Sequence, residues 1–300
     1  MKKFYANGKL LITGEYLVLD GAKSLAVPTR KGQSLNFQEK KGQTLSWKSL
    51  DSNGEIWFEA MFSSENFNVL ESSNTTTANF LQQLLINAKE IKKPSINFSG
   101  EVTTKLDFPR NWGFGSSSTL ISCVAQWFII DPFKLHFSIS NGSGYDIACA
   151  NSNSAISYTL TNKKASYQTI KWKPTFKNSF FFVHLNKKQN SAKEVAKYQK
   201  QKQELSLQVD QITKLTDQII SCETLHEFTI LIEKHEQIIS DITGIPTIKN
   251  QLFSDFKGTI KSLGAWGGDF ILVIGAEEEK DYFSSKGYST QLNFDDALIC

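Results

Sequence analysis

A glycine- and serine-rich turn at residues 113–118 leads directly into an almost unbroken apolar segment at 119–130. An apolar run of this length, ended by Asp131-Pro132, predicts a buried helix. Glycines let backbone N–H groups approach an anion closely, and the N-terminus of a helix carries partial positive charge. The pattern therefore predicts a phosphate-binding turn, although it matches neither a P-loop nor a dinucleotide fingerprint. A serine-capped helix after a flexible turn is the alternative.

The rest of the chain alternates between strand-like and helix-like patterns. Short β-rich runs predict strands at 10–12, 16–19, 35–37, 45–47, 56–58, 147–160, 180–185 and 270–274. Helical spacing of apolar residues predicts helices at 77–91 and 248–260, and two amphipathic helices within 191–241. We therefore expect an α+β fold of two domains, residues 1–175 and 176–300.

Composition excludes several classes of function. The chain has 300 residues, 33 basic and 30 acidic, for a net charge of +3, and only two of the basic residues are arginines. This balance argues against nucleic-acid binding. The four cysteines form no metal-binding or CxxC spacing, and no signal peptide or membrane-spanning run is evident. The sequence predicts a cytoplasmic protein that binds no membrane, with its thiols reduced.

Three segments resemble, in the same order, the three motifs of the GHMP small-molecule kinases. They are GKLLITGEY at 8–16, PRNWGFGSSS at 109–118 and KSLGAWGGD at 261–269. A fourth segment, GSGYDIA at 142–148, resembles a group of bacterial GHMP kinases recognised by that motif. The resemblance spans nearly the whole chain. It implies an ATP-binding N-terminal domain like domain 2 of ribosomal protein S5 and a ferredoxin-like C-terminal domain.

The resemblance also implies Mg²⁺ and ATP as cofactors, bound at the central turn. The expected nucleotide-binding residues are Trp112, Gly113, Gly115, Ser116, Ser117 and Ser118. Serine hydroxyls donate to phosphate oxygens, and Ser117 is the expected Mg²⁺ ligand.

Asp146 and Lys9 are the catalytic candidates. Phosphoryl transfer to an alcohol needs a base that accepts the hydroxyl proton, and an aspartate held between a glycine turn and an apolar strand suits that role. Lys9 follows a glycine and precedes an apolar strand, so its ammonium group is placed to stabilise phosphate charge. The resemblance assigns both residues to the active site. The alternatives are an Asx-turn aspartate and a solvated lysine.

The acceptor is expected to be phosphomevalonate or mevalonate, because GEY and GGD resemble phosphomevalonate kinases whereas residues 21–28 resemble mevalonate kinases. The expected substrate-side residues are Glu15, Tyr16, Arg110, Ser191, Lys193, Gly267 and Gly268. Of these, Glu15 is also expected to tie the first hairpin to the site, and an N-cap with a solvated lysine is the alternative for Ser191 and Lys193. His235, on an apolar helical face, is expected to be a buried structural histidine.

Two departures from the family pattern leave other functions open. No glutamate occurs from residue 102 to 193, where relatives supply a Mg²⁺ ligand, and Asp131 is the one carboxylate between the turn and Asp146. Trp266 replaces a glycine of the third motif and is expected to narrow the loop beside the phosphates. A diphosphomevalonate decarboxylase and a nucleotide-binding protein without turnover are the alternatives. The expected partner is a small-molecule substrate, and the choice between monomer and homodimer stays open.

Overall fold

The computed structural model describes residues 1–92, 98–189, 191–200 and 204–300, and these residues form two compact units. The first unit comprises residues 1–8, 31–110 and 114–151, and the second comprises 9–30, 111–113 and 152–300. Strands β1 (Lys2–Leu11) and β2 (Ser24–Glu39) contribute residues to both units. The expected division into domains at 1–175 and 176–300 stays a prediction.

Six strands of an eight-stranded sheet lie wholly or partly in the first unit. Their order is β5 (Val69–Ser72), β4 (Ile56–Ser63), β3 (Thr44–Leu50), β6 (Gly100–Leu106) and the second half of β2, with β1 paired to β2. Strands β3 and β6 pair in parallel, and the other pairs along this order are antiparallel. Residues of β3 and β6 alternate between buried and more exposed positions, as expected where a layer covers one face of a sheet.

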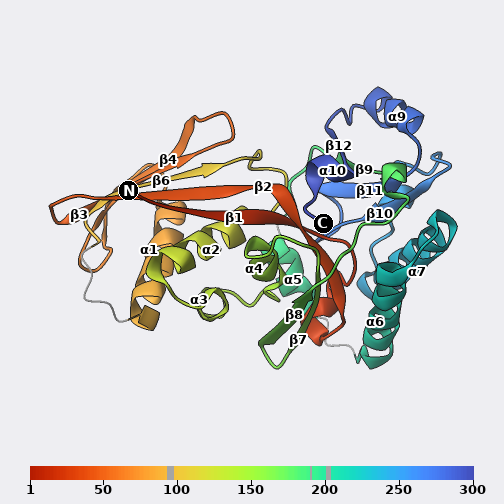
Figure 1. The fold of residues 1–300 in the computed structure, drawn as a ribbon, viewed down its shortest axis with the longest axis horizontal. Helices are drawn as coiled ribbons and strands as arrows, with labels where there is room; N and C mark the ends of the chain where they lie inside the picture. The colour runs from red at the N-terminus through yellow and green to blue at the C-terminus, as the bar shows by residue number, and fades with distance from the viewer. Residues whose placement is uncertain (93–97, 190, 201–203) are drawn as a thin grey trace. The chain divides into compact units, whose positions relative to one another are not determined.

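Helices cover that face. They are α1 (Thr75–Lys92), α2 (Ser116–Phe128), α3 (Pro132–Ile139) and α4 (Tyr145–Ala150), and Figure 1 shows α1 and α2 on one side of the strands. The helix predicted over 77–91 is confirmed by α1, whose buried residues Ala78, Leu81, Leu85 and Ala88 follow helical spacing. The buried helix predicted over 119–130 is confirmed by α2.

The second unit contains two groups of strands. The first half of β2 pairs with β7 (Ile156–Thr161), which pairs with β8 (Lys164–Thr169). A separate antiparallel sheet has the order β10 (Thr259–Ser262), β11 (Phe270–Ile274), β9 (Phe180–His184) and β12 (Gln291–Asn293). Every residue of β9, β10 and β11 is buried. These strands therefore form the centre of the unit.

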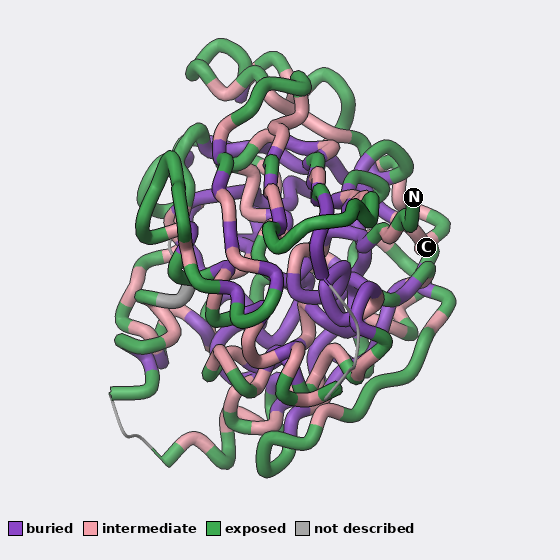
Figure 2. The backbone as a smooth tube through the Cα atoms, turned by 90° about the vertical axis from the view of Figure 1, so that its left-hand side faces the viewer, coloured by how far each residue is buried: buried purple, intermediate pink, exposed green. Residues whose placement is uncertain are grey.

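Two long amphipathic helices, α6 (Ser206–Ser221) and α7 (Leu225–Thr243), pack against each other, and α7 also packs against β10. They confirm the two helices predicted within 191–241, and a further helix, α5 (Ser191–Gln199), precedes them. The remaining short helices are η1 (Leu17–Asp20), η2 (Lys177–Ser179), α8 (Ile248–Leu252), η3 (Glu277–Glu279), α9 (Lys280–Ser285) and α10 (Phe294–Ala297). Figure 2 shows buried, half-buried and exposed stretches following one another along the chain.

Three secondary-structure predictions are wrong. The strand predicted over 16–19 is instead occupied largely by the 3₁₀ turn η1 (Leu17–Asp20), because Gly14, Tyr16 and Gly21 all have positive φ angles, which strands do not accommodate. The strand predicted over 147–160 begins only at Ile156, after helix α4. The helix predicted over 248–260 ends at Leu252. In each case the pattern reports that residues are buried, and a buried segment can be a strand, a helix or a turn.

Among the described residues, no helix is both long and apolar enough to cross a lipid bilayer.

Candidate active site

The central turn begins in the second unit, where aromatic contacts hold its first residues. The Trp112 ring packs edge-on against Phe270, with 5.4 Å between ring centroids, and lies 6.4 Å from the His184 ring. Asn186 donates its N–H to His184 Nδ1, so Nε2 carries the imidazole proton and donates to the carbonyl of Asn111 at 3.0 Å. The start of the turn is therefore anchored to the ends of β9 and β11.

Gly113 lies directly against Asp269 of the third motif. Its φ angle is +67°, and a β-carbon there would lie 2.2 Å from Asp269 Cγ and 2.3 Å from Oδ2. Asp269 is held by its own backbone, which donates to Lys187 O and accepts from Leu185 N, while its Oδ1 accepts from Gln189 N at 3.0 Å. The second and third motifs therefore meet at Gly113 and Asp269, and only glycine leaves room for so close a contact. Sequence analysis quoted Asp269 within GGD but assigned it no role.

The turn continues in the first unit, where it becomes the N-terminus of α2. Gly115, with a φ angle of +89°, precedes the helix and provides no side-chain cap. Ser118 is buried and its hydroxyl donates to the carbonyl of Gly115 at 2.9 Å, whereas Ser117 is exposed and Ser116 is half-buried. The first N–H groups of a 13-residue helix have no partner within it, which makes this end suitable for an anion.

Asp146 lies in the first turn of α4, not before a strand as the sequence predicted. Gly144 begins the helix with a φ angle of +82°, and Asp146 Oδ1 accepts from the N–H of Ile147 at 3.0 Å. The carboxylate is only partly buried. Helix α4 packs against α2, so the candidate base and the candidate phosphate site share one helix pair. Lys9 belongs to the second unit, and its approach to Asp146 stays a prediction.

The first motif is built around Gly14 and Tyr16. Gly14, with a φ angle of +90°, approaches Ser24 so closely that a β-carbon would lie 2.1 Å from Ser24 Oγ. Tyr16 donates its hydroxyl to the carbonyl of Ala265, at 3.0 Å, in the third motif. Lys9 is half-buried in β1. The first and third motifs are thus joined within the second unit.

A cluster of buried charged side chains lies where these two motifs meet. Lys261 Nζ lies 2.5 Å from Glu15 Oε1 and 3.1 Å from Glu236 Oε1, and it also donates to Ser262 O at 2.7 Å. Glu15 and Lys261 have no exposed surface. Desolvation raises the pKa of Glu15 to about 7 despite the opposing attraction of Lys261. His235 is buried as predicted and accepts a hydrogen bond from the backbone. Sequence analysis assigned no role to Lys261 or Glu236, because no local pattern indicates their partners.

The glycine-rich loop of the third motif has an unusual backbone. Gly264, Trp266 and Gly267 have φ angles of +60°, +47° and +81°. Gln189 donates to the carbonyl of Trp266 at 2.5 Å. The Trp266 indole is 1% exposed, so it packs inside the protein and does not project from the loop. Gly268 lies against residue 187, whose carbonyl oxygen would be 2.7 Å from a β-carbon.

The remaining substrate-side residues belong to both units. Lys193 lies exposed on α5, and Ser191 begins that helix, but its side chain lies outside what the structure describes. Arg110 is in the first unit, with its guanidinium carbon 3.7 Å from the centre of the Trp57 ring, a cation–π contact. Arg110 belongs to the first unit and Lys193 to the second, so a common substrate site for the two stays a prediction.

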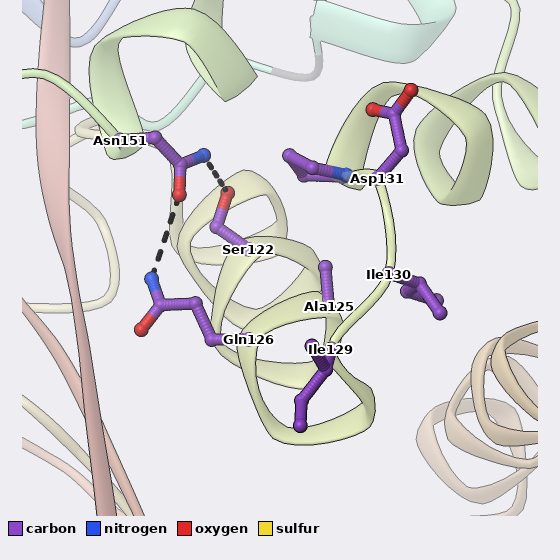
Figure 3. A pocket seen from close by; sticks show the side chains of 8 residues that line it. Ser122, Ala125, Gln126, Ile129, Ile130, Asp131 and Asn151 are labelled. Atoms are coloured by element: carbon purple, nitrogen blue, oxygen red, sulfur yellow. Dashed lines mark hydrogen bonds between the residues drawn. The ribbon is translucent and has the colours of Figure 1, made fainter. Parts of the chain in front are cut away.

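A hollow of about 480 Å³ lies at the other end of α2. Figure 3 shows Asn151 bonded to Ser122 and Gln126 on one side of it and Asp131 on the other. Asp131 caps α3 by accepting from the N–H of Phe133 at 2.8 Å. Because 13 helical residues span about 20 Å, Asp131 is too distant to bind a metal ion at the N-terminus of α2. None of the predicted site residues lines this hollow.

Three solved structures resemble the whole chain. Phosphomevalonate kinase of Streptococcus pneumoniae, in complex with phosphomevalonate and AMPPNP, matches with a TM-score of 0.73 and 14% identity, over 98% of this chain and 100% of that one. The chain has the fold of the GHMP kinases. Mevalonate kinase of Methanococcus jannaschii matches with a TM-score of 0.68 and 16% identity, over 100% and 98%. Galactokinase of Lactococcus lactis, complexed with galactose, matches with a TM-score of 0.66 and 12% identity, over 99% and 93%.

The GHMP kinase fold therefore rests on three-dimensional similarity. A scan of protein-family models finds no match, and neither does a comparison with curated protein sequences. The predicted α+β class is confirmed. The finer expectations, a domain like ribosomal protein S5 domain 2 and a ferredoxin-like domain, stay predictions.

Proposed function

We propose that the chain is an ATP-dependent small-molecule kinase that phosphorylates an acceptor of the mevalonate type, phosphomevalonate or mevalonate. The observation that carries this proposal is the full-length similarity to a kinase that binds phosphomevalonate and AMPPNP. The meeting of the three motif segments supports it: Gly113 contacts Asp269, and Tyr16 bonds Ala265.

In this proposal the nucleotide phosphates bind over the central turn. Gly113 and Gly115 present backbone N–H groups without a β-carbon, and α2 adds its N-terminal dipole. Ser116 and Ser117 provide further donors, while the Ser118 hydroxyl already donates to a carbonyl. Trp112, beside the turn, provides an aromatic wall.

The donors beside the turn fit Mg²⁺. The Asp269 carboxylate adjoins Gly113, and a carboxylate beside a phosphate site would repel phosphate unless a cation lay between them. Mg²⁺ is commonly bound by one or two carboxylates together with substrate phosphates. Asp269 therefore takes the place of the missing glutamate, with the Ser117 hydroxyl as a further ligand. The bound ion would neutralise charge on the triphosphate.

Asp146 and Lys9 keep the roles that the resemblance assigns to them. The acceptor oxygen attacks the γ-phosphorus, the bond from that phosphorus to the β–γ bridging oxygen breaks, and ADP leaves. Asp146 accepts the proton of an acceptor hydroxyl, and the Lys9 ammonium stabilises charge on the transferring group. Lys193 and Arg110 supply positive charge for an anionic acceptor.

The test is ADP production with mevalonate, phosphomevalonate, homoserine and galactose as acceptors. A kinase makes ADP and a phosphorylated acceptor in equal amounts, whereas a decarboxylase releases CO₂ with diphosphomevalonate. Asp146→Asn should lower turnover by about 10²-fold or more while AMPPNP still binds. AMPPNP binding with no ADP from any acceptor would contradict the kinase proposal, and full turnover by Asp146→Asn would contradict the assigned base.

A further inference from the structure

The buried cluster in the second unit provides a hydrogen-bond acceptor for every hydrogen of the Lys261 ammonium group. An ammonium group has three hydrogens, and Lys261 Nζ has three acceptors: Glu15 Oε1 at 2.5 Å, Glu236 Oε1 at 3.1 Å and Ser262 O at 2.7 Å. None of these side chains is more than 5% exposed. Lys261 therefore has no hydrogen left for a ligand, and its role must be exerted through these partners.

The charges of the cluster do not balance if both carboxylates are ionised. Two carboxylates face one ammonium group, and an uncompensated buried charge is costly. His235 does not supply the missing positive charge, because its Nε2 accepts from the N–H of Gly14 at 2.9 Å and is therefore unprotonated. Burial, and to a lesser extent the proximity of Lys261, keeps the pKa of His235 well below its usual range. The cluster becomes neutral when it takes up one further proton.

The hydrogen bonds indicate which carboxylate holds that proton. Both oxygens of Glu236 accept hydrogen bonds, Oε1 from Lys261 and Oε2 from the Ser262 hydroxyl at 2.8 Å. Glu15 Oε2 has no hydrogen-bond partner in the described parts of the chain, and it lies 3.3 Å from His235 Nε2, an acceptor. The lone pair of Nε2 already accepts from Gly14, so an ionised Oε2 at this distance would face another electron-rich atom with no hydrogen to compensate its charge. Protonation of Glu15 removes that charge.

The cluster connects two motifs of the proposed active site. Glu15 stands between Gly14 and Tyr16, and Tyr16 donates to the carbonyl of Ala265. Lys261 and Ser262 end strand β10, from which the glycine-rich loop follows. The titratable groups facing Glu15 from the packed elements are Tyr16 on its own turn, Glu236 and His235 on α7, and Lys261 on β10. Movement of the Glu15–Lys261 pair would therefore move the loop.

We propose that Lys261 is a positioning residue that holds the glycine-rich loop against the first motif. It holds the loop while the Glu15 carboxyl in the same cluster is protonated. The proposal rests on the proposed kinase function for its catalytic consequence. The protonation of Glu15 is independent of that function.

The first experiment uses Glu15→Gln, which keeps the shape of a protonated glutamate and cannot ionise. Urea unfolding is measured for wild type and variant from pH 5 to 8. The unfolding free energy of the wild type minus that of Glu15→Gln should fall as pH rises, because only the wild type must bury a second negative charge. A difference that is constant with pH would overturn the protonation of Glu15, whatever reaction the protein catalyses.

The second experiment tests positioning with Lys261→Met, which keeps the side-chain length and removes the charge. We expect AMPPNP to bind at least about tenfold more weakly, which corresponds to ~1.4 kcal/mol. Lys249→Met is the matched control, because within the described residues Lys249 bonds a backbone carbonyl, that of Gly258 at 2.7 Å, and no carboxylate, and it should change affinity less than about twofold. Equal affinities for both variants would overturn the positioning role.

The third measurement separates positioning from a general loss of stability. In the wild type, kcat/KM should fall above pH 7 as Glu15 ionises, and in Glu15→Gln this fall should be absent. If Lys261→Met does not fold, the double variant Lys261→Met with Glu15→Gln replaces it in the AMPPNP measurement. That variant leaves one carboxylate in the cluster, and this carboxylate can take up a proton. A fall above pH 7 that persists in Glu15→Gln would overturn the proposal. Absence of turnover in the wild type would refute the kinase function and leave the unfolding and AMPPNP tests intact.

Discussion

The carboxyl carbon of Asp269 lies 2.2 Å from the position that a β-carbon on Gly113 would occupy. This contact joins the turn before α2 to the third motif, although 156 residues separate them in the chain. It gives Gly113 a steric reason to be glycine and places a carboxylate beside the proposed phosphate site. Both consequences can be measured.

Gly113→Ala should destabilise the protein and weaken AMPPNP binding. The left-handed backbone costs alanine about 1–2 kcal/mol, and the overlap with Asp269 adds about 1–3 kcal/mol. Urea unfolding measures the sum. The control is Gly244→Ala, at a nearly identical φ angle of +66°, where no atom of the described residues other than its chain neighbours would lie within 4 Å of the added carbon. Equal losses in the two variants would show that the Asp269 contact has no energetic effect.

Asp269→Asn should weaken divalent-metal binding in the presence of AMPPNP. An amide oxygen lacks the negative charge that Mg²⁺ and Mn²⁺ prefer, so we expect a loss of about tenfold or more. Electron paramagnetic resonance of Mn²⁺ reports binding without turnover. Asp131→Asn is the control, because asparagine caps a helix as well as aspartate does and α3 is remote from the turn. Unchanged Mn²⁺ affinity in Asp269→Asn would refute the metal assignment.

His235 should make a pH-dependent contribution to stability that is opposite in sign to that of Glu15. Its pKa is lowered in the folded protein by burial and by Lys261, so the folded state stays neutral while the unfolded chain gains a proton below about pH 6.5. The stability that neutral His235 provides is therefore lost as pH falls below 6.5. As pH is lowered below 6.5, the unfolding free energy of the wild type minus that of His235→Gln should decrease by up to ~1.4 kcal/mol per pH unit. A difference that is constant from pH 5 to 6.5 would contradict a neutral, buried His235.

Trp266→Gly should destabilise the second unit. Removing a side chain that is 1% exposed leaves a cavity costing about 3–5 kcal/mol, and relief of the positive φ angle returns only about 1 kcal/mol. Thermal unfolding measures the net loss. Trp266→Phe, which keeps most of the ring volume and removes the indole N–H, should cost less than the glycine variant. A glycine variant as stable as the wild type would show that the indole does not contribute to the core.

Helices were predicted best where apolar spacing extended over several turns. The stripe at 77–91 and the apolar run at 119–130 both became helices, because burial of one helical face or of a whole helix leaves a mark in the local sequence. Residues 16–19 and 147–150 were misassigned, because a short apolar run is equally compatible with a strand, a helix or a buried turn. The glycines around them, Gly14, Gly21 and Gly144, adopt φ angles that a sequence pattern does not specify.

The amino-acid sequence by itself determined the order of the three motifs, the α+β class and the residue types available at each turn, because these depend on local spacing and composition. Only the tertiary structure decided which side chains became partners. Lys261 with Glu15, Asp269 with Gly113, and Tyr16 with Ala265 are each separated by more than 150 residues in the chain. Such contacts arise from the packing of strands and helices, and so do the burial and charge balance that give the Glu15–Lys261–Glu236 cluster its chemistry.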